Sequence, residues 1–124
     1  MGEGSTRWRE VQSELRQPAL DMRALIPDAW KAYAELHKAS MAPGVLDSKT
    51  KELIALAVAD AVQCDGCIAS HARALARMGV TEAEVAEALA VVILLRGGPG
   101  TVYGPRSLEA FQEFKRHYEG REGS

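Results

Sequence analysis

The sequence contains no apolar run long enough to cross a membrane. A membrane-spanning helix needs about 20 predominantly apolar residues, and the longest run here, residues 88–95, stops at Arg96. The polar first residues, 1–7, also lack the apolar centre of a secretory signal peptide. We therefore expect a cytoplasmic protein with no membrane partner.

The chain also has little net charge. Its 15 Lys and Arg residues nearly balance its 17 Asp and Glu residues, which gives a formal net charge of −2 at pH 7. A protein that binds nucleic acid needs a basic surface to neutralise phosphates. The charge balance therefore argues against nucleic acid as a main partner.

The length and the apolar content bear on domain number and assembly. A chain of 124 residues has the size of one domain, so we treat residues 1–124 as a single unit. Residues 53–95 are rich in Ala, Val, Leu and Ile. Helices that are apolar on most sides need cover from another surface, and a small domain buries only about two-thirds of its unfolded surface. We therefore expect an obligate homo-oligomer.

No segment predicts a convincing strand, whereas helical signals occur throughout the chain, so we expect an all-α fold of about six helices. Pro18 is expected to interrupt the first helix, and Pro27 to break or kink the second. Val102 and Leu108 are expected to be buried on the last helix, together with Phe111 and Phe114. A flexible tail is expected over 119–124. The expected helices cover about residues 7–15, 19–40, 49–62, 66–78, 82–96 and 101–118.

Three residues suggest redox chemistry. Cys64 and Cys67 are the two cysteines of the chain, and His71 follows them, so the three lie at i, i+3 and i+7 on one stripe of a helix. In a reducing compartment such a close cysteine pair is more often catalytic or metal-binding than structural. The start of a helix favours a thiolate. An imidazole one turn further along can accept or deliver a proton.

Glu52 is the fourth candidate residue. It precedes Cys64 by twelve residues on a helix that is otherwise apolar at this point. A carboxylate is costly to bury without a partner, and the imidazole of His71 would be a fitting one. The alternative is a buried glutamate that is hydrogen-bonded only to the backbone.

Other interpretations of these residues stay open. Cys64, Cys67, His71 and Glu52 are also a possible tetrahedral ligand set, which would make the chain a small metal-binding protein. A structural zinc site usually takes its ligands from loops rather than three from one helix stripe, so this hypothesis ranks second. A third hypothesis is a non-catalytic oligomer that uses the cysteines for redox sensing, and a fourth is inert packing.

The pattern from Glu52 to His71 resembles a known family. Glutamate, eleven residues, Cys-x-x-Cys, three residues and histidine are similar to the core of the carboxymuconolactone decarboxylase superfamily, in its alkylhydroperoxidase D (AhpD)-like branch. The likeness extends over residues 46–114. It implies a single AhpD-like helical domain, and homo-oligomers that are often hexamers built as trimers of dimers.

The resemblance also implies a thiol-dependent peroxidase with an antioxidant function. Cys67 would attack a hydroperoxide and become a sulfenic acid. Cys64 would donate a proton and then resolve the sulfenic acid as a Cys64–Cys67 disulfide. His71 and Glu52 would form the proton relay. A dithiol or lipoylated protein would be the reductant, and neither a cofactor nor a metal is implied.

One position departs from that branch. The branch has a histidine next to the second cysteine, and this chain has Gly66 there. One member of the relay is therefore missing, and we expect weaker peroxidase activity. The cysteine pair in turn argues against the decarboxylase activity that names the superfamily, because lactone chemistry does not call for a vicinal dithiol.

Overall fold

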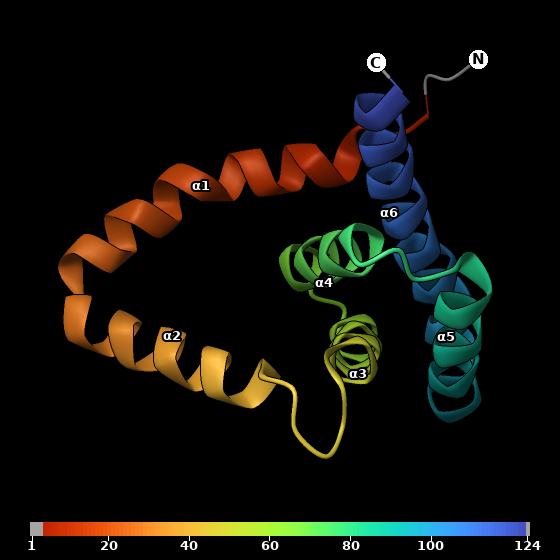
Figure 1. Ribbon diagram of the computed structural model, residues 1–124, viewed down its shortest axis with the longest axis horizontal. Coiled ribbons are helices and arrows are strands. Elements are labelled where there is room, and N and C mark those ends of the chain that lie inside the picture. Colours follow the sequence, from red (N-terminus) through yellow and green to blue (C-terminus); the bar gives the residue numbers. More distant parts are fainter. Residues whose placement is uncertain (1–3, 124) are drawn as a thin grey trace.

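The computed structural model describes residues 4–123, and within them it contains helices and no strand, which confirms the all-α prediction. Figure 1 shows the six helices in chain order. They are α1 (Arg7–Leu25), α2 (Pro27–Met41), α3 (Ser48–Ala61), α4 (Asp65–Arg77), α5 (Glu82–Arg96) and α6 (Gly98–Gly123). None of the described helices is both long and apolar enough to serve as a membrane span.

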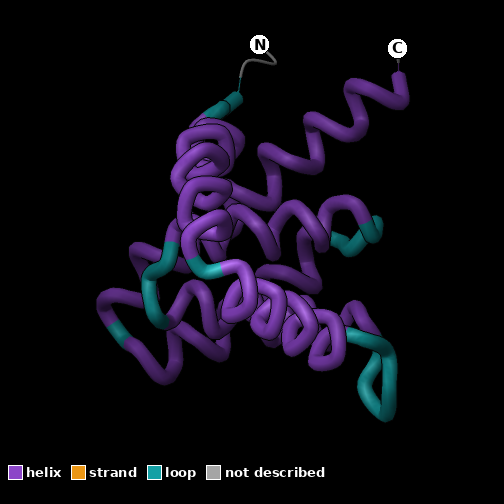
Figure 2. Tube along the Cα trace, turned by 90° about the vertical axis from the view of Figure 1, so that its left-hand side faces the viewer, coloured by secondary structure: helices purple, strands orange, loops and turns teal. Residues whose placement is uncertain are grey.

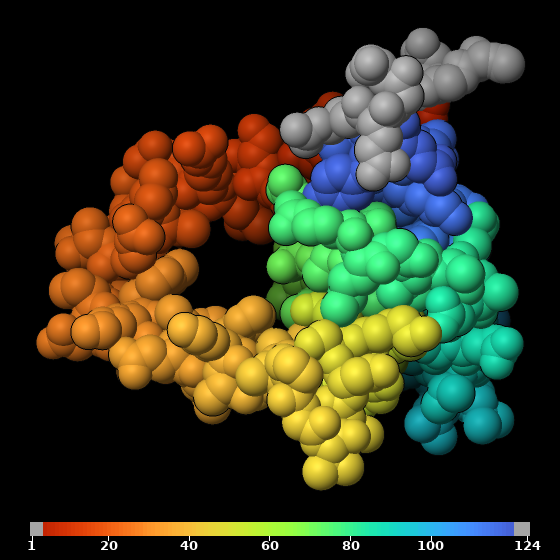
Figure 3. Space-filling view, in the orientation of Figure 1, coloured from red at the N-terminus to blue at the C-terminus, as the bar shows by residue number. Residues whose placement is uncertain are grey.

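The helices form a packed body and a projecting arm. Helices α3 to α6 make the body, in which α6 packs against both α4 and α5 (Figure 1). Helices α1 and α2 make the arm, which leaves the body at α6 and returns to α3; the loops that join the helices are short (Figure 2). The space-filling view shows an opening between the arm and the body (Figure 3). The first half of α1 packs on α4 and α6, and α2 rejoins the body at α3.

The core lies where α4, α5 and α6 meet the start of α1. Phe111 and Phe114 are buried as predicted. Val102 was expected beside them but is 56% exposed, which corrects that prediction. The buried stripe of α6 runs through Ser107 and Ala110 to Phe114 at intervals of three or four residues, and Val102 lies off this stripe.

The predicted bounds of the first, second and last helices are wrong. The first helix does not stop at Pro18 but continues to Leu25. A proline inside a helix removes one backbone hydrogen bond, and here the exposed surface of α1 accommodates the loss. The break predicted at Pro27 is confirmed: Pro27 begins α2, where a missing backbone N–H costs nothing. The last helix also runs past Tyr118 to Gly123, so residues 119–123 of the expected tail are helical.

The other helix ends follow the sequence signals. The Asp47 side chain caps α3 by accepting the backbone N–H of Thr50 at 2.8 Å. Thr81 and Glu84 form a reciprocal capping box at the start of α5. Gly97 ends α5 with a φ of 68°, a conformation that glycine adopts without steric cost.

A buried glutamate fixes the arm to the body. Glu113 of α6 accepts the backbone N–H of Trp8 at 3.0 Å, and the backbone N–H and Nε–H of Arg9 at 2.9 and 3.0 Å. The first backbone N–H groups of a helix have no partner within the helix. Glu113 supplies that partner and places a negative charge at the positive end of the α1 dipole. The indole of the buried Trp8 adds a bond to Glu109 at 2.9 Å.

We predict that Glu113→Ala lowers the free energy of unfolding by about 3 kcal/mol, because it leaves buried donors without an acceptor. Urea denaturation at one fixed protein concentration measures the change. The exposed Glu87→Ala on α5 is the control and is expected to stay within about 0.5 kcal/mol of wild type. Equal midpoints for Glu113→Ala and wild type would contradict this role of Glu113.

Candidate active site

The cysteine pair lies at the beginning of α4. Gln63 adopts a φ of 58°, in the left-handed region, and so turns the chain out of α3. Cys64 is the N-cap of α4, and its Sγ accepts the backbone N–H of Cys67 at 3.3 Å. The two cysteines form a disulfide, with their Cα atoms 5.3 Å apart. Because the residue Cys67 is exposed, the pair is open to attack from outside.

A buried contact behind the cysteines holds the α3–α4 turn. The Ser107 hydroxyl of α6 donates a hydrogen bond to Asp60, which lies four residues before Cys64 and is buried. Burial raises the pKa of the Asp60 carboxyl, and the Ser107 hydrogen bond and the charge of Arg96 offset this only in part. The contact thus joins α6 to the end of α3, just before the turn that leads to the disulfide.

The structure brings His71 and Glu52 together. His71 Nδ1 and Glu52 Oε2 are 2.8 Å apart, and the bond joins α4 to α3. The side chains are 19% and 13% exposed, so water screens the pair only weakly. If Nδ1 carries the proton and donates it to the carboxylate, Nε2 is left as an acceptor. The imidazole can then act as a base while Glu52 stabilises the charge that it acquires.

The relay and the dithiol are neighbours on α4 but are not hydrogen-bonded to one another. Cys67 and His71 are four residues apart, so their side chains lie one turn apart on the same side of the helix. Among the residues the structure describes, the side chains of His71 and Glu52 are hydrogen-bonded to each other and not to either cysteine. Their catalytic roles therefore remain a prediction.

Asp65, between the two cysteines, is held by two cations that sequence analysis did not single out. Its Oδ2 lies 3.4 Å from Arg7 of α1 and 3.9 Å from Arg106 of α6. These cations offset the negative charge of Asp65 beside the sulfur atoms. They come from the two ends of the chain, so no local spacing in the sequence indicated them.

Gly66 occupies a position that α1 covers. A Cβ atom at Gly66 would lie 2.9 Å from Cδ1 of Leu15. Any larger residue, including the histidine of the AhpD-like branch, would therefore require the Leu15 side chain to move. The glycine at position 66 thus allows the side chain of Leu15 in α1 to pack on the start of α4.

The alternative zinc site is not assembled in the described residues. Within 4–123, no three His, Cys, Asp or Glu side chains converge as a metal-binding group. The sulfur atoms of the proposed ligand set are bonded to one another, and the other two members form their own pair. In this geometry the four residues form two separate pairs, a disulfide and an imidazole–carboxylate pair.

A cavity opens beside the relay, between the arm and the body. Its volume is about 440 Å³, and residues of α1, α2, α3 and α4 line it. Sequence analysis did not associate His37 with the site, since it lies on a separate helix, α2. The cavity is lined by Gln12, His37, Glu52, Ser70, His71, Arg73, Ala74 and Arg77.

Comparison with known proteins identifies relatives of this chain. The family model for the carboxymuconolactone decarboxylase family matches residues 27–112. A protein from Haemophilus influenzae is 42% identical over 106 residues, which are 86% of this chain and 94% of that protein. A protein of the cox locus of Paracoccus denitrificans is 37% identical over 82 residues, 66% of this chain and 74% of that protein.

Solved structures match as well. A carboxymuconolactone decarboxylase family protein from Legionella pneumophila, in its apo form, superposes with a TM-score of 0.87 at 35% identity, over 90% of this chain and 99% of that one. A family protein from Thermotoga maritima, for which an antioxidative role has been suggested, superposes with a TM-score of 0.68 at 28% identity. That match covers 74% of this chain and 95% of the other.

Proposed function

Because this chain belongs to the carboxymuconolactone decarboxylase family, we propose that it is a thiol peroxidase that reduces organic hydroperoxides at the expense of a dithiol partner. The observation that carries the proposal is the Cys64–Cys67 disulfide at the start of α4, one turn from the bonded pair of His71 and Glu52. A reversible disulfide beside a proton relay suits two-electron redox chemistry.

In the first step of this reaction, Cys67 attacks the peroxide. His71 takes the proton of the Cys67 thiol, and Glu52 stabilises the resulting imidazolium. The Cys67 thiolate then attacks one peroxide oxygen, the O–O bond breaks, and a sulfenic acid forms on Cys67. The leaving alkoxide takes the proton of the Cys64 thiol and departs as an alcohol. This step oxidises one sulfur by two electrons and reduces the peroxide by two.

In the second step, Cys64 resolves the sulfenic acid. Its thiolate attacks the Cys67 sulfur, the S–S bond forms, and hydroxide leaves and takes the proton of the His71 imidazolium as water. A dithiol partner, such as a lipoylated protein, then exchanges with the disulfide. Both cysteines return as thiols and the partner leaves as its own disulfide. His71 is neutral again at the end of the cycle.

The test is peroxide consumption by the reduced protein with dihydrolipoamide as the dithiol. We expect wild type to consume cumene hydroperoxide, and Cys67→Ser to lose at least about a hundredfold in kcat/KM, because the nucleophile is gone. Cys64→Ser is the matched control. It should react once, form no disulfide, and accumulate a sulfenic acid on Cys67 that dimedone labels.

Two outcomes would overturn the proposal. If Cys67→Ser consumed peroxide as wild type does, Cys67 would not be the nucleophile. If wild type formed and lost the disulfide reversibly but showed no turnover with any dithiol, the chain would be a redox sensor rather than a peroxidase.

We also propose that further copies of the chain cover its exposed apolar faces and form a homo-oligomer, as a trimer of dimers. On α5, Leu94 and Leu95 are 80% and 79% exposed, and Val91 is exposed beside them. On α3, Ile54 and Val58 are also exposed. Apolar faces of this extent are typical of subunit interfaces.

We predict that Leu94→Glu shifts the sedimentation coefficient of the protein toward that of one protomer, because it places a charge in the interface. Ala83→Glu, an exposed position in the first turn of the same helix, adds the same charge and should leave the assembly intact. A wild-type protein that sediments as one protomer at micromolar concentration would contradict the oligomer.

A further inference from the structure

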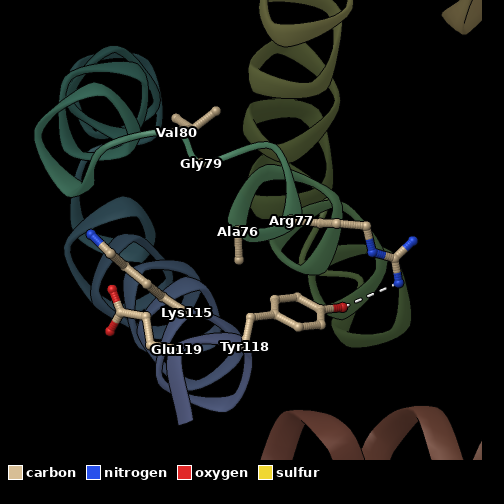
Figure 4. Close-up of a pocket in the computed structure, with 7 residues that line it drawn as sticks. All are labelled: Ala76, Arg77, Gly79, Val80, Lys115, Tyr118 and Glu119. Atoms are coloured by element: carbon tan, nitrogen blue, oxygen red, sulfur yellow. Dashed lines mark hydrogen bonds between the residues drawn. The ribbon is translucent and has the colours of Figure 1, made fainter. Parts of the chain in front are cut away.

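Two arginines of α4 meet at one phenol. Arg73 donates its Nε–H to the hydroxyl of Tyr118 at 2.7 Å, and Arg77 donates from one terminal nitrogen to the same hydroxyl at 3.1 Å. Figure 4 shows the Arg77–Tyr118 bond, with the phenol reaching from α6 toward α4. Arg73 donates a further bond to Gln12 of the arm at 3.1 Å. The two guanidinium groups are thus held in place by neutral partners.

Within residues 4–123, neither arginine of this pair forms an ion pair. Arg7, Arg9 and Arg106 are each paired with a carboxylate, whereas among the described residues no carboxylate pairs with Arg73 or Arg77. A guanidinium has five N–H donors, and the bonds within the described chain occupy two of Arg73 and one of Arg77. Most of the donors therefore remain available to an anion.

Tyr118 responds to this charge. Burial raises the pKa of the Tyr118 phenol, but the hydrogen bonds and charges of Arg73 and Arg77 outweigh burial and leave the pKa below its usual value. Two neighbouring cations favour an anion as their partner, and in this structure they share a phenolic oxygen.

The unbalanced charge borders the cavity of the relay. Arg73 and Arg77 line the same cavity of about 440 Å³ as His71 and Glu52. That volume lies in the range of small-molecule sites. Cys67 is not among the residues that line this cavity, whereas His71, one turn further along α4, is.

We infer that Arg73 and Arg77 bind the carboxylate of a small organic acid whose hydroperoxide group lies beside His71 in this cavity. The hydroperoxide part of this inference rests on the proposed function, whereas carboxylate binding does not. The carboxylate takes no part in the electron transfer and serves to hold the substrate. A charge-assisted bidentate bond to guanidinium is the interaction that these free donors are suited to make.

The first experiment measures binding without turnover. Isothermal titration calorimetry with 4-isopropylbenzoate is compared with its uncharged isostere, 4-isopropylbenzamide. We expect the carboxylate to bind at least about tenfold more tightly, and Arg73→Gln and Arg77→Gln to abolish that preference. Arg73→Lys, which keeps the charge but not the planar fork, should retain part of it. Arg23→Gln on α1, at an exposed position outside the cavity, is the matched control.

The second experiment measures turnover with cumene hydroperoxide and its para-carboxylate. We expect a kcat/KM ratio of at least about ten in favour of the carboxylate, falling toward one in Arg77→Gln. Both substrates are measured on the same protein sample, so a loss of folded protein lowers both rates and leaves the ratio unchanged. If the benzoate binds through the arginines but neither peroxide is consumed, the carboxylate site stands and the proposed peroxidase fails.

Other results would overturn the inference. A peroxidase that treats the two hydroperoxides alike, or a benzoate and a benzamide that bind equally, would show that the arginines do not select a carboxylate. If Arg77→Gln instead shifted the sedimentation coefficient toward one protomer, the arginines would pair with an acidic group of a second copy, and the inference would be wrong.

Discussion

Burial of one face of α4 is the constraint on which the rest of the site depends. Ile68, Ala72 and Leu75 of this helix are buried against the body. Cys67 and His71 flank this buried stripe, so that Cys67 is exposed and His71 is turned toward α3. The helix start thereby holds the disulfide, and one turn later the imidazole meets α3. A rotation of α4 would displace sulfur, imidazole and guanidinium groups together.

The part of this arrangement that sequence could predict rests on local rules. The capping box at Thr81 and the cap at Asp47 are set by residues within one turn of each other. The pairing of Glu52 with His71 was also predictable, because a carboxylate on an apolar helix needs a partner and the histidine was available in register. Buried Phe111 and Phe114 followed from helical spacing.

The features that sequence could not predict are long-range. Glu113 caps α1 from more than a hundred residues away, and no spacing rule connects them. Pro18 was expected to end a helix, yet an exposed helix can accommodate a lost hydrogen bond. Arg73 and Arg77 carried a weak signal, two cations one turn apart with no acidic residue at helical distance on either side. Their meeting at Tyr118 depends on how α6 packs.

The central claim is that the bonded pair of Glu52 and His71 activates Cys67. The most direct measurement is the single-turnover rate at which cumene hydroperoxide oxidises the reduced protein, followed by rapid quenching with a thiol-alkylating reagent and mass determination. The account predicts that Glu52→Gln slows this rate at least about tenfold, since it removes the charge that stabilises the imidazolium, whereas Glu87→Gln does not. Equal rates for Glu52→Gln and wild type across pH 5 to 9 would contradict it.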